Sequence, residues 1–127
     1  MTSLPQSKIA IVDDDFRIRD SLENLLESAG YLVCSFSSAQ SLLDDRTLPE
    51  IDCLIADIGM PLINGFELQR LVRDARPDLP IIFMTALPEA ATQKRAAVQG
   101  HQGFFRKPFD GPALLAAVTR CCAAARP

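Results

Sequence analysis

Short apolar runs recur along the chain and are separated by longer amphipathic stretches. Five runs, each of four residues or fewer, cover residues 9–12, 31–34, 53–56, 81–84 and 104–105. Runs of this length are too short for helices, and they suit strands that are covered on both faces. The pattern therefore predicts five short, buried strands.

The stretches between these runs place apolar residues at helical spacing. Five helices are predicted, over residues 18–29, 38–43, 66–72, 89–99 and 110–118. Gly30 ends the first helix, while Ser38 and Asp110 are suited to cap the second and the fifth. Strands that alternate with helices form a parallel sheet with helices on both faces. The predicted fold class is α/β, doubly wound.

Length and composition narrow the classes of function. The 127 residues are one domain's worth, and 48% hydrophobic with 23% charged residues is the profile of a soluble globular domain. Thirteen basic residues stand against sixteen acidic ones, so the net charge is −3, and no direct nucleic-acid binding by this domain is expected. No apolar run is long enough to cross a membrane, and the first residues do not form a secretory signal. We therefore expect a cytoplasmic protein.

Four cysteines are the first candidates for metal or redox chemistry. Cys34, Cys53, Cys121 and Cys122 fit neither a CxxC pair nor a zinc site. We interpret them as small buried hydrophobic residues.

Polar residues follow four of the predicted strands. Strand one runs into Asp13, Asp14 and Asp15, strand three into Asp57, strand four into Thr85 and strand five into Lys107. These strand ends meet at one edge of the sheet, where α/β proteins form their sites. Crowded carboxylates need a counter-charge, and Mg²⁺ takes oxygen ligands while leaving room for a phosphate. An aspartate can then serve as a nucleophile toward phosphorus, and a lysine can pair with a phosphoryl oxygen.

The polar residues belong to an ordered set of motifs. In order they read Ile11-Val12-Asp13-Asp14-Asp15, Asp57-x-x-Met60-Pro61-x-x-Asn64-Gly65, Thr85-Ala86 and Lys107-Pro108-Phe109. This set resembles the receiver domain of bacterial two-component response regulators, and residues 11–43 look most like the FixJ-type branch. The resemblance covers nearly the whole chain, so we expect a single receiver domain over residues 1–127 with a core at about 8–123. It implies a flavodoxin-like sheet with strand order 2-1-3-4-5.

The resemblance implies a role for each acidic residue. Asp57 matches the phosphorylated aspartate. Asp14 matches the direct ligand of Mg²⁺ (or Mn²⁺), Asp13 the acid that holds the metal through water, and Gly59 the residue whose backbone carbonyl binds it. Asp15 is expected to cap the following helix instead of binding metal.

The remaining motif residues are implied to respond to phosphorylation. Thr85 matches the hydroxyl that moves to the phosphoryl group, and Lys107 matches the lysine that pairs with a phosphoryl oxygen. Phe104, three residues earlier, matches the aromatic residue that turns inward on activation. The Lys107–Pro108 bond matches one that is cis in the family.

The resemblance also implies partners. The phosphoryl group comes from a sensor histidine kinase or a small phosphodonor. The responding face, made of the fourth helix, fifth strand and fifth helix, then controls homodimer formation or an output partner. If the chain is a piece of a longer regulator, a DNA-binding output domain would follow it.

Two other functions compete with this one. A haloacid-dehalogenase-type phosphohydrolase also uses an aspartate nucleophile and Mg²⁺, but it wants a second acid where this chain has Gly59. A pseudo-receiver that acts only through interactions would lack one of the acids, the threonine or the lysine, and none is missing. Gly59 and Leu87 offer no polar group to a hydrolytic water, so slow self-dephosphorylation is expected.

Overall fold

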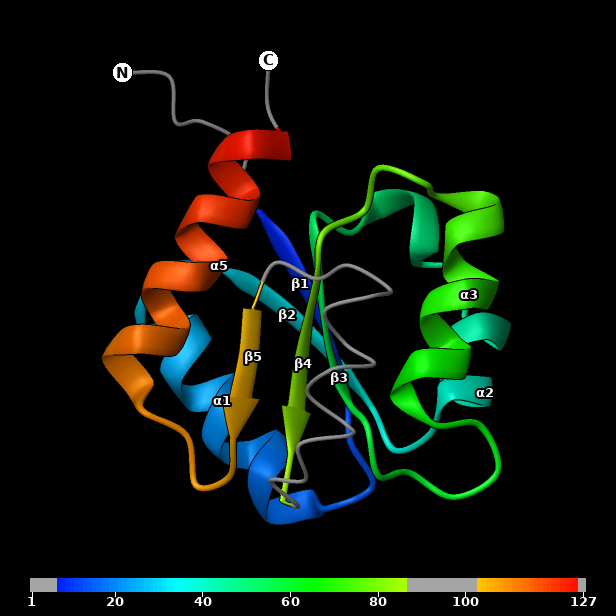
Figure 1. Cartoon of the computed structure of the whole chain (residues 1–127). Helices are drawn as coiled ribbons and strands as arrows, with labels where there is room; N and C mark the ends of the chain where they lie inside the picture. Colours follow the sequence, from blue (N-terminus) through cyan, green and yellow to red (C-terminus); the bar gives the residue numbers. More distant parts are fainter. Residues whose placement is uncertain (1–6, 87–102, 126–127) are drawn as a thin grey trace.

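The computed structural model describes residues 7–86 and 103–125, and its centre is a parallel sheet. The strand order is β2-β1-β3-β4-β5, which confirms the expected order (Figure 1). The strands are β1 (Lys8–Val12), β2 (Leu32–Phe36), β3 (Cys53–Asp57), β4 (Ile81–Thr85) and β5 (Gly103–Arg106). The doubly wound α/β class predicted from the alternating pattern is therefore confirmed.

Helices cover both faces of the sheet, two described helices to each face. Helix α1 (Phe16–Ser28) and helix α5 (Gly111–Ala125) lie on one face; α2 (Ala39–Asp44) and α3 (Gly65–Ala75) lie on the other (Figure 1). A short 3₁₀ turn, η1 (Leu48–Glu50), which the periodicity did not predict, precedes β3. The helix predicted over residues 89–99 lies outside the described residues.

The predicted caps form the helix ends. Asp15 caps α1 by accepting a hydrogen bond from the Arg17 backbone N–H, and Ser38 caps α2 in the same way. Asp110 accepts a bond from the Ala113 N–H at 3.3 Å, at the start of α5. Gly30 follows the end of α1 with φ +96°, a backbone conformation that costs glycine little. Each cap satisfies backbone groups that the helix itself leaves unpaired.

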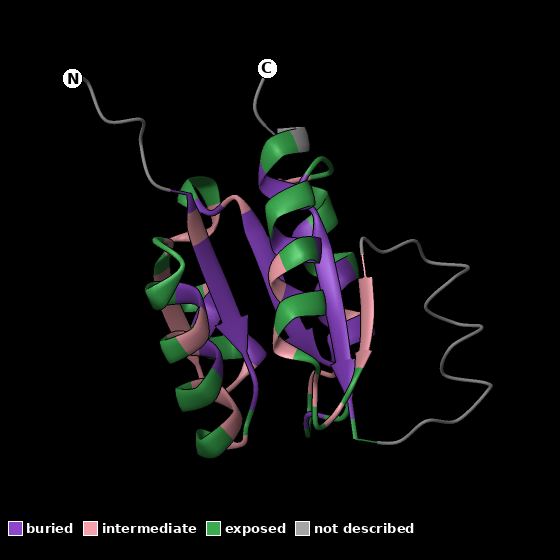
Figure 2. Cartoon of the chain, turned by 90° about the vertical axis from the view of Figure 1, so that its left-hand side faces the viewer, coloured by how far each residue is buried: buried purple, intermediate pink, exposed green. Residues whose placement is uncertain are grey.

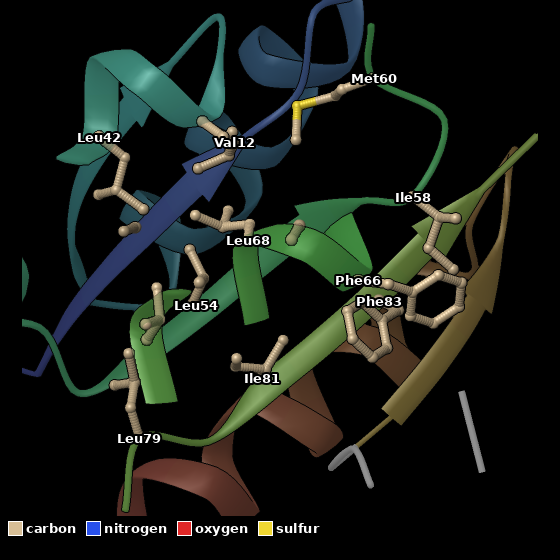
Figure 3. Packing of buried hydrophobic residues seen from close by; sticks show 14 of the residues in the cluster. Val12, Leu42, Leu54, Ile58, Met60, Phe66, Leu68, Leu79, Ile81 and Phe83 are labelled. Atoms are coloured by element: carbon tan, nitrogen blue, oxygen red, sulfur yellow. The ribbon is translucent and has the colours of Figure 1, made fainter. Parts of the chain in front are cut away.

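The apolar core forms two clusters, one on each face of the sheet. In one, Phe66 of α3 meets Phe83 of β4 edge to face, with ring centroids 5.1 Å apart (Figure 3). In the other, Leu22 and Leu26 of α1 pack with Leu114 of α5. Strands β1, β3 and β4 supply side chains to both clusters, so they are covered on both faces.

The two edge strands depart from the expectation that every strand is covered on both faces. Residues of β2 and β5 are mostly half-buried, in contrast to the buried β3 and β4 (Figure 2). An edge strand has one neighbouring strand in place of two, which leaves part of its surface open. A short apolar run does not distinguish an edge strand from a central one.

The cysteines are packed in the apolar interior. Cys53, Cys121 and Cys122 are buried and Cys34 is half-buried, and each keeps its thiol rather than forming a disulfide. In the described part of the chain, no helix has the length and apolar character needed to cross a membrane.

Candidate functional site

The site lies at the carboxyl edge of the sheet, where β1, β3, β4 and β5 end. A pocket of about 570 Å³ opens there, and its lining includes Asp14, Asp57, Gly59, Thr85 and Lys107. Asp57 and Thr85 are the last residues of β3 and β4. The parallel strands thus bring together side chains that are far apart in the sequence.

Three carboxylates form the acidic part of the site. Asp13, Asp14 and Asp57 each offer an oxygen, and these oxygens lie within 4.8 Å of one another. Asp13 and Asp57 are only 1% and 6% exposed, whereas Asp14 is exposed to solvent. Backbone groups hold the buried pair: Asp13 accepts a bond from the Asp15 N–H at 2.9 Å, and Asp57 accepts one from the Gly59 N–H at 3.1 Å.

Lys107 supplies the positive charge. Its Nζ lies 2.7 Å from Asp13 Oδ2 and 3.4 Å from Asp57 Oδ2, so it bridges the two buried carboxylates. Its backbone N–H donates to the Thr85 carbonyl at 2.8 Å, which fixes the end of β5 beside the end of β4. The Lys107–Pro108 bond is cis, as the family resemblance implies.

The electrostatics of this cluster leave one carboxyl poorly stabilised as an anion. Burial, with repulsion from Asp13 second, raises the pKa of Asp57, and the Gly59 N–H and Lys107 offset this only in part. Burial by itself would lower the pKa of Lys107, but its bonds to Asp13 and Asp57 outweigh burial and raise that pKa. The lysine therefore stays charged, and one ammonium faces two buried carboxylates.

The donor set fits a hard divalent cation. Three carboxylates within one ion's reach supply the oxygen ligands that Mg²⁺ prefers. The site is open on the side of Asp14, so water can complete the coordination. Such an ion would balance the negative charge that Lys107 leaves uncompensated.

Thr85 and Phe104 lie in different surroundings. Thr85 is buried and borders the pocket. Phe104 of β5 is half-buried and packs against the core cluster that contains Phe66 and Phe83. Of the predicted site residues, Asp13 and Phe104 do not line the described pocket; Asp13 still contacts Lys107, whereas the strand neighbour of Phe104 is Phe83. The structure therefore brings six of the seven residues together and sets Phe104 beside them in the core.

Two arginines near the site were not singled out from the sequence. Arg19 Nη1 donates to the Asp13 carbonyl at 2.8 Å, with its guanidinium 5.8 Å from the centre of the Phe16 ring, and Arg17 borders the pocket. A signal was available, because cations in the first turn of a helix oppose its dipole. Leu87, invoked for the lifetime of the phosphorylated form, lies outside the described residues.

Known proteins share both the sequence and the fold. Residues 9–119 match the family model of the response regulator receiver domain. The transcriptional regulatory protein FixJ of Bradyrhizobium diazoefficiens is 34% identical over 119 residues, which cover 94% of this chain and 58% of FixJ. The response regulator TodT of Pseudomonas putida is 36% identical over 112 residues, 88% of this chain and 49% of TodT. The chain thus spans about half the length of these curated relatives.

A solved structure gives the same result for the fold. The chemotaxis protein CheY4 of Vibrio cholerae superposes with a TM-score of 0.84 at 28% identity, over 92% of this chain and 99% of that one. The chain belongs to the family of response regulator receiver domains, which are phosphorylation-dependent signalling switches.

Proposed function

We propose that Asp57 is the residue that accepts the phosphoryl group. The observation that carries this is the position of Asp57 at the end of β3, bordering an open pocket and 3.4 Å from Lys107. A carboxylate oxygen of Asp57 attacks phosphorus, and the bond between phosphorus and the donor breaks as the acyl phosphate forms. The donor is a histidine kinase or a small phosphodonor.

Mg²⁺ is the cofactor we assign to the site, with Mn²⁺ as an alternative. Asp14 and Asp57 would bind it directly with the Gly59 carbonyl, and Asp13 would hold it through water. When bound, it neutralises charge on the transferring group. The Asp15 N–H and Lys107 both contact the Asp13 carboxylate and hold it in place at the site.

Lys107 and Thr85 bind the new phosphoryl group. The lysine pairs with one phosphoryl oxygen, and the threonine hydroxyl turns toward another. Movement of Thr85 leaves space beside Phe104, whose ring turns inward and changes the face of β5 and α5. The fourth helix expected over residues 89–99 belongs to this face and lies outside the described residues.

The consequences for the whole protein belong to the same proposal. Residues 1–127 form one receiver domain with a core at about 8–123, and its only chemistry is its own phosphorylation and dephosphorylation. The changed face promotes a homodimer or docks an output partner, which is a DNA-binding domain if the chain is part of a longer regulator. The domain itself binds neither DNA nor membrane and works in the cytoplasm.

The alternatives explain the site less well. A haloacid-dehalogenase-type hydrolase needs a second acid two residues after the nucleophile. This chain has Gly59 there, which carries no carboxylate. A pseudo-receiver would not need an acidic triad with a bridging lysine.

Intact-mass measurement tests the proposal. The protein is incubated with acetyl phosphate with Mg²⁺ or with a chelator, and we expect one phosphoryl adduct only with Mg²⁺. Asp57→Asn abolishes the adduct, while the control Asp52→Asn, at the other end of β3, retains it. An adduct that persists in Asp57→Asn, or forms equally under chelation, contradicts the proposal.

A further inference from the structure

One aromatic residue lines the pocket that contains Asp57. Phe16, the first residue of α1, is 68% exposed, and no other described lining residue is aromatic. Beside it in the lining, the side chain of Arg17 is 91% exposed. Asp57, in contrast, is only 6% exposed. The pocket therefore extends from a buried carboxylate to an exposed rim that carries a phenyl ring.

The Phe16 ring is held in place at this rim. The Arg19 guanidinium lies over the ring, with its central carbon 5.8 Å from the ring centre, which is a cation–π distance. Arg19 is itself fixed, because its Nη1 donates a hydrogen bond to the Asp13 carbonyl oxygen at 2.8 Å. Single exposed apolar residues are common on protein surfaces and need no function. This ring differs from them because an anchored cation orients it beside a reactive carboxylate.

The geometry of phosphoryl transfer decides which part of a donor meets this ring. The attacking oxygen, the phosphorus and the leaving atom lie roughly in line during transfer. Asp57 attacks from the buried end of the pocket, so the leaving group departs toward the exposed end. Phe16 and Arg17 belong to that end. These residues are therefore placed to contact the leaving group.

We propose that Phe16 makes the pocket selective for phosphodonors whose leaving group is an imidazole ring. Phe16 has this role only if Asp57 is the nucleophile, as proposed above. A bond forms between an Asp57 carboxylate oxygen and phosphorus while the P–N bond of the donor breaks. The electron pair of the P–N bond stays on the ring nitrogen, and the ring, already protonated on its other nitrogen, leaves as neutral imidazole. Phe16 stacks on this ring as it departs.

Acetyl phosphate provides the contrast. Its leaving group, acetate, is a small anion without an aromatic face, so stacking on Phe16 adds nothing to its transfer. The face of a phenyl ring also carries partial negative charge, which disfavours an anion. An N-phosphorylated imidazole, whether free or carried by a histidine side chain, presents the same flat ring. The two kinds of donor should therefore respond differently to the loss of the phenyl ring.

The rates of phosphorylation by two small donors test the proposal. The full chain is incubated with Mg²⁺ and either phosphoimidazole or acetyl phosphate, and the phosphoryl adduct is followed by intact mass. The selectivity is the second-order rate constant for phosphoimidazole divided by that for acetyl phosphate. We expect Phe16→Leu, which keeps a large apolar side chain, to lower this selectivity by about three- to tenfold. Phe16→Tyr retains the ring and should retain the selectivity.

Two further variants separate stacking from indirect effects. Leu71→Ala is the control, because Leu71 is also an exposed apolar residue but lies on α3, outside this pocket. It should leave the selectivity unchanged. Arg19 acts by positioning the ring, so Arg19→Gln should lower the selectivity of the parent. It should have no further effect in a chain that already carries Phe16→Leu.

A phosphohistidine-carrying protein, used as a third donor, separates the ring from its carrier. A fall in rate seen with this donor but not with phosphoimidazole in Phe16→Leu would overturn the proposal, because a surface contact would then explain it. Equal falls with phosphoimidazole and acetyl phosphate would also overturn it, since the ring would then only shape the pocket. If acetyl phosphate still modifies Asp57 while the selectivity is unchanged, only the role of Phe16 is rejected. An adduct with no donor in the parent chain would reject the assignment of Asp57 as well.

Discussion

At the scale of single residues, the site combines charges that do not balance. Asp57 is buried beside Asp13, and both share the single ammonium of Lys107. Burial and the neighbouring carboxylate raise the pKa of Asp57, so the folded chain holds that proton more tightly than the unfolded chain does. The folded state therefore loses stability as pH rises from the ordinary range of an aspartate through the raised pKa.

Removal of the Asp57 charge should stabilise the metal-free protein. We expect Asp57→Asn to raise the free energy of unfolding by about 0.5–2 kcal/mol at pH 7, as is common where a functional site is strained. The gain should shrink as pH falls below the raised pKa, because the parent carboxyl is then neutral too. Urea denaturation at several pH values measures both effects. A variant less stable than the parent at pH 7 would show that pairing with Lys107 outweighs the repulsion.

The lifetime of the phosphorylated form should depend on Gly59. A Cβ at this position would lie 3.8 Å from Asp57 Oδ1, close enough for a longer polar side chain to reach a water at the phosphoryl group. We expect Gly59→Asn to shorten the lifetime by a factor on the order of ten, because it orients the hydrolytic water. Loss of the phosphoryl adduct over time, followed by intact mass, measures this. Gly59→Ala is the control, and an Asn variant no faster than the Ala variant would contradict the prediction.

At the scale of elements, the start of α3 is packed against the end of β3. A Cβ added to Gly65 would lie 2.8 Å from the Asp57 carbonyl oxygen and 3.1 Å from the Ile58 Cα. Both contacts are with backbone, which cannot move without displacing the phosphorylation site. The first residue of α3 must therefore be glycine, because the backbone of Asp57 and Ile58 lies too close for a Cβ.

Gly65→Ala should therefore destabilise the fold. We expect a loss of about 1–3 kcal/mol in the free energy of unfolding, the usual range for overpacking. Gly111→Ala is the matched control, because Gly111 also begins a helix. A Cβ added there would meet Leu25 side-chain atoms at ordinary distances of 3.6 Å or more. The control should change stability little. Equal losses in the two variants, measured by urea denaturation, would argue against the packing explanation.

Strand β5 carries the expected response to phosphorylation. Phe104 and Phe105 point to opposite faces of the sheet, the former toward Phe66 and Phe83 and the latter toward the cluster that contains α5. We expect beryllofluoride with Mg²⁺, a mimic of the phosphoryl group, to shift the NMR signals of the Phe104 ring more than those of Phe105. Shifts confined to residues of the acidic pocket would contradict a switch through this strand.

At the scale of the whole molecule, much of the fold follows from local patterns. The alternation of short apolar runs with amphipathic stretches predicted a parallel sheet, and Asp15, Ser38 and Asp110 predicted where helices begin. The strand-end position of Asp57, Thr85 and Lys107 predicted that they would meet, since parallel strands end at a common edge. These features depend on spacing along the chain, which a sequence displays.

Other features depend on contacts between distant segments. The edge exposure of β2 and β5 follows from strand order, which no single run contains. Two sets of contacts exist only in the assembled site. Lys107 bridges Asp13 and Asp57, and Arg19 donates a hydrogen bond to the Asp13 carbonyl.

Localisation of the phosphoryl group tests the central claim most directly. Protein phosphorylated by acetyl phosphate is reduced with borohydride, which converts an acyl phosphate to an alcohol, and the tryptic peptides are sequenced by fragmentation. Peptide 47–70 contains both Asp52 and Asp57, so the unmodified Asp52 is an internal control. The account predicts conversion at Asp57 alone. Conversion at Asp13, Asp14 or Asp52, with Asp57 unchanged, would contradict it.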